Sequence, residues 1–208
     1  MLLEDSIKPR GGAVRTNFDE AYYRRYYGGA ATKARDRRTQ RRLASLVFAY
    51  LDHLEIPVRR VVDLGCGLGA WRRELAARYP TASYTGVEAS EYPRRKYGWD
   101  DGTAATYRGR GRYDLVICQG VLQYVDDGEF RASIANIARL CRGAAFLEIP
   151  TVRDWNENCD RSTSDGQIYM RSGEWYRREI GRHFRSAGGG VWLPKDSDAV
   201  LYELEGAG

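Results

Sequence analysis

The chain has 208 residues with a formal net charge of +5, and 43% of its residues are hydrophobic and 29% charged. This suits one domain with a short appendage, with enough apolar residues for a packed core. No run reaches the roughly 18–20 apolar residues that a membrane-spanning helix needs, and the N-terminus lacks the long apolar run of a secretory signal. We therefore expect a cytoplasmic protein with no membrane partner.

Residues 1–38 form an N-terminal segment that differs from the rest of the chain. Glycine and proline interrupt any pattern before an aromatic and basic cluster, AYYRRYY, at 21–27. Tyrosines spaced by three and four residues predict either one packed helical stripe or a lid over a ligand. These tyrosines are Tyr22, Tyr23, Tyr26 and Tyr27.

From residue 39 onward, helical and strand patterns alternate, and we treat 39–208 as the main domain. Helical spacing of apolar residues predicts helices over 39–54, 70–80, 128–141 and 172–184. Short apolar runs predict strands over 59–64, 83–89, 112–120 and 143–150. Such alternation is typical of a parallel sheet covered on both faces.

The C-terminal part of the chain is less regular. Residues 151–171 carry little pattern, and a long loop in a compact domain is often functional. Ser172 is the expected N-cap of the helix that follows. Two final runs, at 188–195 and 199–205, predict an antiparallel pair of strands.

The four cysteines show neither a metal-binding nor a disulfide pattern. Cys66, Cys118, Cys141 and Cys159 form no CxxC pair, and three of them lie in or beside apolar runs. Buried free thiols are the best interpretation of such positions. We therefore expect no metal site.

The segment VVDLGCGLGAW at 61–71 carries the strongest functional signal. A strand ends at Asp63, and Gly65, Gly67 and Gly69 follow before a helix begins. Glycines at such a turn let a ligand approach main-chain atoms that a Cβ would shield. The pattern predicts a cofactor-binding loop.

A second acid, Glu88, ends the next strand, where a carboxylate can accept hydrogen bonds from both ribose hydroxyls. A nicotinamide dinucleotide and S-adenosylmethionine both fit this arrangement. A dinucleotide would bring its pyrophosphate to the glycine loop, where the carboxylate of Asp63 would repel it. S-adenosylmethionine carries a sulfonium and an ammonium instead, which Asp63 would attract.

At these motifs the sequence resembles the class I S-adenosylmethionine-dependent methyltransferases. The resemblance rests on VVDLGCGLGAW, YTGVEAS and RYDLVICQGVLQYV, and it covers roughly residues 40–150. It implies an α/β fold: a Rossmann-like, doubly wound, seven-stranded and mostly parallel sheet with an antiparallel last strand. It also implies a transferase that uses S-adenosyl-L-methionine as its cofactor.

The resemblance further implies which residues bind the cofactor. Asp63 and the glycine loop would hold the methionine part, and Glu88 the ribose. The strand end near Gln119 would line the cleft beside the methyl group, and Trp71 would either border the cofactor or pack in the core. The full expected set is Asp63, Gly65, Cys66, Gly67, Trp71, Glu88, Ala89, Thr103, Gln119, Gly120 and Val121.

The sequence departs from the family pattern at two places. Many members have an acid that binds the adenine amine, but Thr103 stands at that place in DGTAATY (101–107). Backbone groups, the Thr103 hydroxyl or Asp101 would then contact adenine. Many small-molecule members also have a histidine where this chain has Tyr124, so a histidine base is absent there.

Methyl transfer from a sulfonium is an in-line displacement with a neutral leaving group, so positioning and desolvation can supply much of the catalysis. A base is needed only if the acceptor holds its proton tightly. The candidate catalytic residues are Tyr124, Glu148 and His183. Glu148 lies near a strand end, as an acceptor-site residue or a salt-bridged structural acid. His183 is either a base or a helix-terminal residue favoured by the helix dipole, and His53 is expected to be exposed.

Four functions are compatible with these motifs. We favour methylation of a small-molecule acceptor, with residues 151–184 as its binding region and Trp155, Tyr169 and Trp175 as a possible aromatic pocket. Methylation of RNA or protein is the runner-up, through the arginine-rich stretch at 33–42, which is otherwise a solvated helix face. An NAD-dependent oxidoreductase, disfavoured by Asp63, is the third, and a cofactor-binding protein without catalysis is the fourth. The methylated atom and the oligomeric state are not determined by these residues.

Overall fold

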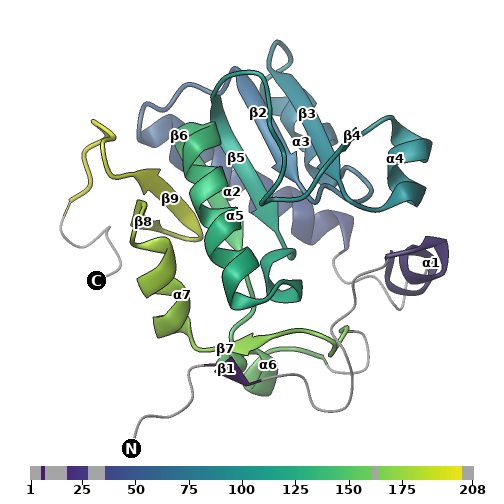
Figure 1. The fold of residues 1–208 in the computed structure, drawn as a ribbon. Helices are drawn as coiled ribbons and strands as arrows, with labels where there is room; N and C mark the ends of the chain where they lie inside the picture. Colours follow the sequence, from purple (N-terminus) through teal and green to yellow (C-terminus); the bar gives the residue numbers. More distant parts are fainter. Residues whose placement is uncertain (1–5, 8–17, 28–35, 161–163, 203–208) are drawn as a thin grey trace, which may run out of the picture.

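The computed structural model describes residues 6–7, 18–27, 36–160 and 164–202. Its body is a seven-stranded sheet in the order β4-β3-β2-β5-β6-β9-β8 (Figure 1). The strands are β2 (Arg60–Leu64), β3 (Ser83–Glu88), β4 (Asp100–Asp101), β5 (Tyr113–Gln119), β6 (Cys141–Glu148), β8 (Phe184–Gly188) and β9 (Val191–Pro194). Strands β2 to β6 are parallel, and β9 is antiparallel to both of its neighbours. The predicted fold class is confirmed.

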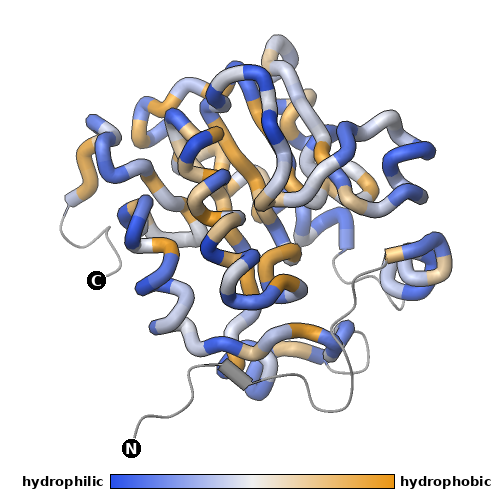
Figure 2. Tube along the Cα trace, in the orientation of Figure 1, coloured by the Kyte–Doolittle hydropathy of each residue, from blue (hydrophilic) through white to orange (hydrophobic). Residues whose placement is uncertain are grey.

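Helices cover both faces of this sheet. Helices α2 (Arg37–His53) and α3 (Ala70–Arg78) pack on one face, and α5 (Asp127–Leu140) and α7 (Gly173–Ile180) pack on the other (Figure 1). Successive strand residues point to opposite faces, so Val61 packs with α2 and α3 while Val62 packs with α5 and α7. The apolar residues concentrate along the central strands, as Figure 2 shows.

Shorter elements lie beside the carboxyl ends of the strands. They are α1 (Glu20–Tyr27), α4 (Glu91–Tyr97), the 3-10 turn η1 (Leu122–Tyr124), α6 (Val152–Glu157), β1 (Ser6–Ile7) and β7 (Met170–Arg171). Strands β1 and β7 form a separate antiparallel pair, which lies beside α6 below the main sheet in Figure 1. They bring the N-terminal and the 151–171 segments to one side of the molecule.

The prediction for the last two strands was only partly right: β9 lies within the predicted run 188–195 and has an antiparallel partner, but that partner precedes it in the chain. Strand β8 begins at Phe184, within the predicted helix, and pairs with β9. Gly189 and Gly190, with positive φ values of 56° and 82°, form the hairpin turn, and Gly188 ends β8, where it pairs with Val191. Residues 199–202 form no strand, and 203–205 lie outside the described residues.

Residues 151–171, predicted to be a long loop with little pattern, contain a short helix. Thr151 and Asp154 form a capping box that begins α6: the Thr151 hydroxyl oxygen accepts from the Asp154 N–H, and the Asp154 carboxylate accepts from the Thr151 N–H. Such a box satisfies two backbone donors at a helix start. The predicted cap of α7 is confirmed, because the Ser172 hydroxyl oxygen accepts from the Trp175 N–H.

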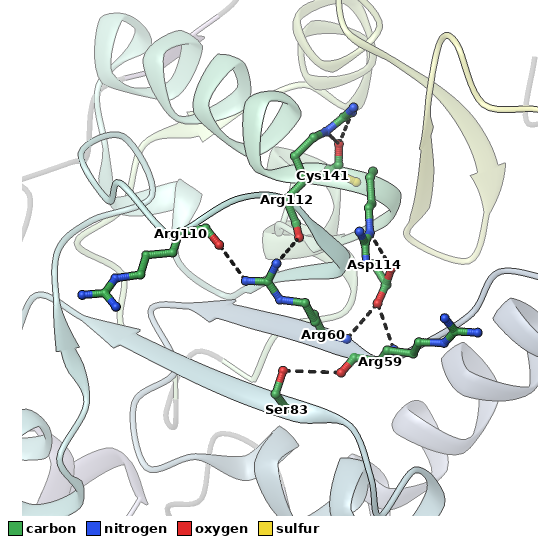
Figure 3. Close-up of polar contacts among 8 residues, drawn as sticks. Arg59, Arg60, Ser83, Arg110, Arg112, Asp114 and Cys141 are labelled. Carbon is green, nitrogen blue, oxygen red and sulfur yellow. Dashed lines mark hydrogen bonds and ion pairs between the residues drawn. The ribbon is translucent and has the colours of Figure 1, made fainter.

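The amino-terminal end of the sheet is held by Asp114, a buried carboxylate at the start of β5. Asp114 accepts hydrogen bonds from the backbone N–H groups of Arg59 and Arg60 and from the Arg142 guanidinium, at 2.7–2.9 Å (Figure 3). Burial opposes ionisation, but these donors outweigh it and hold the pKa of Asp114 below its usual value. The carboxylate thus fixes β2 against β5.

Two compositional predictions can be compared with the structure. All four cysteines are free; Cys66, Cys118 and Cys141 are buried, and Cys159 is partly exposed. Burial raises the pKa of Cys141 to about 12, so its thiol stays protonated. Among the described residues, no helix combines the length and the apolar character needed to cross a membrane.

Candidate active site

The glycine loop joins β2 to α3 at the carboxyl end of the sheet. Gly65, Gly67 and Gly69 have φ values of 76°, 51° and 73°, in the left-handed region that favours glycine. The Gly65 N–H donates to the Val87 carbonyl at 2.8 Å, which ties the loop to β3. A Cβ on Gly65 would lie 2.3 Å from Cγ2 of Val121. Backbone conformation and space therefore both require glycine at this position.

Glu88 ends β3 beside this loop and is only 6% exposed. Its two carboxylate oxygens accept from the backbone N–H groups of Gly67 and Ser90, each at 2.9 Å. A carboxylate offers about four acceptor positions, so Glu88 keeps capacity for further donors such as ribose hydroxyls. The two backbone bonds fix its orientation.

Asp63 is 2% exposed and accepts a hydrogen bond from the Tyr84 hydroxyl at 2.6 Å. Burial raises the pKa of Asp63 to about 7, although the Tyr84 hydrogen bond opposes this shift. Among the described residues, no cationic side chain forms an ion pair with Asp63. A buried carboxyl of this kind favours a cationic ligand group, because a nearby positive charge would stabilise its ionised form.

Two joined cavities surround these groups, one of about 310 Å³ and one of about 210 Å³. Both are lined by Tyr22, Tyr27, Gly65, Gly67, Gln119, Gly120 and Tyr124. Only the larger is lined by Asp63, Cys66, Trp71 and Glu148, and only the smaller by Glu88, Ala89, Thr103 and Val121. The structure therefore brings all eleven predicted cofactor residues to the lining of these two cavities, with Asp63 in the larger and Glu88 in the smaller.

The structure separates the three catalytic candidates. Tyr124 lines both cavities and Glu148 the larger one. His183 lies exposed in the turn between α7 and β8, because α7 already ends at Ile180, and it lines neither cavity. Burial raises the pKa of the Tyr124 hydroxyl, which keeps it a neutral hydrogen-bonding group and not a base. His53 is exposed on α2, as expected.

A chain of hydrogen bonds orients Glu148. The Trp71 indole N–H donates to Oε1 of Gln119 at 2.7 Å, and Nε2 of Gln119 donates to Oε1 of Glu148 at 3.2 Å. An indole N–H can only donate, so Trp71 fixes which end of the Gln119 amide faces Glu148. The carboxylate of Glu148 is thus held as an acceptor at the floor of the larger cavity.

Helix α1 contributes aromatic side chains to the cavity walls. The hydroxyls of Tyr22 and Tyr124 lie 3.2 Å apart, within hydrogen-bonding distance. Phe18 packs edge-on against both rings, with centroids 4.8 and 4.9 Å away. Tyr22 and Tyr23 are buried although their helix lies at the edge of the domain. The sequence leaves open whether these tyrosines form a lid or a packed stripe. In the structure they pack on one another and line the cavities, and their action as a lid stays a prediction.

Of the groups expected to contact adenine, only some lie beside the smaller cavity in a suitable arrangement. Thr103 lines the smaller cavity, but its hydroxyl oxygen accepts from the N–H groups of Ala105 and Thr106 within its own turn. Asp101 is exposed and pairs with Arg94 at 2.9 Å, away from both cavities. Backbone groups of 102–104 are therefore the better candidates for contact with adenine.

The predicted aromatic pocket is reduced to one residue. Trp155 lines the larger cavity. Trp175 is buried in the core against Phe130, with ring centroids 4.9 Å apart. Tyr169 packs against the guanidinium of Arg171. Of the predicted acceptor region, the part before α7 reaches the cavity, and α7 itself belongs to the core.

Three residues of the site carry no sequence signal. Trp99 donates from its indole N–H to the Gly67 carbonyl at 2.9 Å, and its ring fills the space beside Gly69. Gln40 and Gln123 line the larger cavity and are each 7% exposed. Within the described residues, Nε2 of Gln40 and Oε1 of Gln123 have no hydrogen-bond partner. They come from α2 and η1, and only the folded chain brings them together.

Residues 34–192 match the family model described as a methyltransferase domain. The chain belongs to this methyltransferase family. The resemblance, the enzyme class and S-adenosylmethionine as the cofactor of the family are thereby confirmed. The oxidoreductase hypothesis receives no support from this match.

Individual proteins show where the similarity lies. A malonyl-[acyl-carrier protein] O-methyltransferase of Legionella pneumophila is 41% identical over 66 residues, which cover 30% of this chain and 23% of that protein. The matches span less than a third of the curated relatives. Magnesium protoporphyrin IX methyltransferase from Synechocystis PCC 6803, solved with bound SAM, superposes with a TM-score of 0.55 at 24% identity over 80% of each chain. The PH0226 protein of Pyrococcus horikoshii OT3 gives a TM-score of 0.62 at 16% identity, over 85% of this chain and all of that one.

Proposed function

We propose that the protein binds S-adenosylmethionine across the two joined cavities and transfers its methyl group to a small-molecule acceptor in the larger cavity. One observation carries the proposal most directly. Asp63 is a buried carboxyl with a raised pKa that faces a cavity and forms no ion pair among the described residues. Such a group fits a ligand that brings positive charge, as the methionine end of S-adenosylmethionine does.

The rest of the site also fits this cofactor. Gly65 and Gly67 line both cavities with main-chain atoms that no Cβ shields. Glu88 is oriented at the far end of the joined cavities, where ribose hydroxyls could donate to it. When bound, the cofactor supplies a methyl group activated by a sulfonium.

The chain itself supplies positioning, exclusion of water and a proton acceptor. Tyr22 and Tyr124 line both cavities and would cover the reacting groups, which raises the effective concentration of acceptor and donor. Glu148, oriented by Gln119, can accept a proton from the acceptor. A cytoplasmic location and residues 1–38 as a lid belong to the same proposal.

Calorimetric titration of the protein with S-adenosylmethionine, S-adenosylhomocysteine and NAD tests the proposal. We expect both adenosyl ligands to bind and NAD not to bind. Asp63→Asn and Glu88→Gln should each weaken binding about tenfold or more, which corresponds to about 1.4 kcal/mol. The exposed Asp198 gives a matched control, Asp198→Asn, which should bind like the wild type. Failure of the wild type to bind either adenosyl ligand would overturn the proposal.

The alternative of a nucleic-acid acceptor rests on the arginines at the start of α2. Arg37, Arg38, Arg41 and Arg42 are exposed, whereas Lys33 and Arg35 lie outside the described residues. Arg41 approaches Glu74 at 3.8 Å, as on an ordinary solvated helix face. RNA binding that weakens steeply with salt would favour this alternative; we expect no such binding.

A further inference from the structure

We infer that the methyl acceptor is a cationic amine, which the larger cavity holds through Glu148 and Asp165 and whose nitrogen receives the methyl group. The inference rests on the proposed function and names the substrate class of the same site. It is carried by the sign of the charge in the cavity, by two buried amides that each have one atom without a hydrogen-bond partner among the described residues, and by the fixed orientation of Glu148.

The charge of the cavity is opposite to that of the chain. The chain carries a formal net charge of +5, yet the described residues that line the larger cavity include five carboxyl groups and two guanidiniums. The acids are Asp36, Asp63, Glu74, Glu148 and Asp165, and the bases are Arg37 and Arg73. Both arginines are exposed, whereas all the acids except Asp36 are buried or half-buried. The interior of this cavity therefore attracts cations.

Three of these acids have a role apart from the acceptor. Asp36 caps α2 by accepting from the Thr39 N–H, Glu74 lies 3.8 Å from Arg41, and Asp63 is assigned to the cofactor. Glu148 accepts from Nε2 of Gln119, and one oxygen of Asp165 accepts from the Gln167 N–H at 3.0 Å. We assign both carboxylates to the acceptor because they line the cavity together with the aromatic residues of its wall. They enter the cavity from β6 and from the segment after α6, so an ammonium between them would be approached from two sides.

Buried amides show that the cavity is built to bind a polar ligand. Gln40 and Gln123 are each 7% exposed, and Nε2 of the first and Oε1 of the second lack hydrogen-bond partners among the described residues. A buried polar atom without a partner costs about 1–3 kcal/mol. A ligand with its own donor and acceptor groups would remove that cost. Gln40 and Gln123 therefore indicate a polar molecule, in addition to the ammonium that the acids favour.

Aromatic side chains in the same wall favour the same charge. Trp155, Tyr26, Tyr27 and the Tyr22–Tyr124 pair line the cavity. Aromatic faces attract ammonium groups through cation–π interactions. Asp165 lines the same cavity as Tyr22 and Tyr124, and its charge adds to burial in raising the pKa of both hydroxyls, so this carboxylate lies near the tyrosine pair. Carboxylate and aromatic groups thus converge on one place.

Methyl transfer to an amine needs one proton transfer and one displacement step. The ammonium of the acceptor donates a proton to the carboxylate of Glu148, which frees the nitrogen lone pair. This nitrogen then forms a bond to the methyl carbon while the carbon–sulfur bond breaks, and its electron pair returns to sulfur. The products are the methylated ammonium ion, which now carries the positive charge of the former sulfonium, and neutral S-adenosylhomocysteine. Glu148 releases its proton to solvent.

Matched ligands that differ only in one group test the inference. Tyramine, tyrosol and 4-hydroxyphenylacetate form one set, and glucosamine, glucose and glucuronate another. Binding to the protein saturated with S-adenosylhomocysteine is measured by NMR saturation transfer, and methyl transfer by label from S-adenosylmethionine. We expect the amine of at least one set to bind at least tenfold more tightly than its alcohol and carboxylate partners, and to be the member that is labelled.

Two variants connect the result to the cavity. Glu148→Gln, which keeps the acceptor oxygen for Gln119, should abolish the preference for the amine. Glu157→Gln makes the same change on exposed α6 outside the cavity and should leave the preference intact. Equal or tighter binding of the alcohols or carboxylates, no binding of either amine to protein that binds S-adenosylhomocysteine, or an unchanged preference in Glu148→Gln would overturn the inference alone. Failure to bind S-adenosylhomocysteine would overturn the proposed function as well.

Discussion

Asp63 and Asp114 are buried carboxyls on the paired strands β2 and β5, and their pKa values are shifted in opposite directions. Asp114, at the amino end of the sheet, is surrounded by two backbone N–H groups and a guanidinium. Asp63, at the carboxyl end, has only the Tyr84 hydroxyl as its side-chain donor among the described residues. The carboxylate of Asp114 is therefore compensated where it holds two strands together, whereas Asp63 has few donors at the place where we propose that the cofactor binds.

The first prediction concerns the pH dependence of Asp63. A carboxyl whose pKa rises to about 7 on folding, from about 4 in the unfolded chain, destabilises the fold increasingly as pH rises from about 4 to 7. Asp63→Asn removes this contribution. The free energy of unfolding of the variant, relative to the wild type, should therefore increase between pH 5 and pH 7.5 when no ligand is present. Urea denaturation at several pH values measures it, and a difference that does not change with pH would contradict the assignment.

The second prediction is that Asp114 stabilises the fold more strongly as pH rises, which is opposite to the effect of Asp63. Its pKa is lowered in the folded protein, so its contribution is fully present above the unfolded pKa of about 4 and is lost as pH falls below that value. Asp114→Asn should lower the free energy of unfolding by about 2–3 kcal/mol at pH 7, because it removes charge-assisted hydrogen bonds. The gap from the wild type should narrow at pH 3, as the same denaturation series will show. Binding of S-adenosylhomocysteine at pH 7 should be unchanged.

Gly65 and Gly98 form a matched pair for testing the glycine loop. Both have left-handed φ values, of 76° and 71°, but a Cβ meets Val121 at Gly65 and open space at Gly98. Gly98→Ala should cost about 1 kcal/mol from the backbone alone. Gly65→Ala should cost about 3 kcal/mol, because overpacking adds to this cost, and should abolish cofactor binding. Equal losses in the two variants would show that space at Gly65 does not matter.

The sequence predicts this site well where its signals are local. The glycine loop, Glu88 and the end of β5 follow directly from strands that end at the same edge of a parallel sheet, and the structure brings these residues around one pair of cavities. The apolar strands and the amphipathic helices likewise follow from short-range periodicity. The capping box at Thr151 is a local signal too, but α6 is short and buries no residue, so no apolar periodicity accompanies it.

Other features depend on contacts between distant parts of the chain. Gln40, Trp99 and Gln123 reach the site from α2, from the link between α4 and β4, and from η1, and nothing in their neighbouring residues marks them as site residues. The sequence misplaces the β8–β9 hairpin because Phe184, a strand residue, continues the apolar spacing of α7. Only pairing with β9 decides between the two structures, since short apolar runs are compatible with both.

The Tyr22–Tyr124 contact predicts that α1 and η1 act together on the cofactor. A double-mutant cycle tests this. Tyr22→Phe and Tyr124→Phe each remove one hydroxyl, and the double variant removes both. We expect a coupling free energy of about 1 kcal/mol in S-adenosylhomocysteine binding, the usual net value of one hydrogen bond. Tyr50, whose hydroxyl donates to the Ala187 carbonyl, supplies the control. Tyr22→Phe and Tyr50→Phe should be additive, and additivity in the Tyr22–Tyr124 cycle itself would contradict the prediction.

Trp71→Phe tests whether the indole N–H acts on catalysis through Gln119. The substitution keeps an aromatic ring against Phe146 but removes the donor that fixes the Gln119 amide, so that Gln119 can turn its oxygen toward Glu148. We expect the methyl-transfer rate constant to fall about tenfold, while the dissociation constant of S-adenosylmethionine changes less than about threefold. Single-turnover transfer and calorimetry separate the two quantities. Trp192→Phe, on β9 outside both cavities, controls for the loss of an indole. If both variants lose the same activity, Trp71 serves only to pack the core.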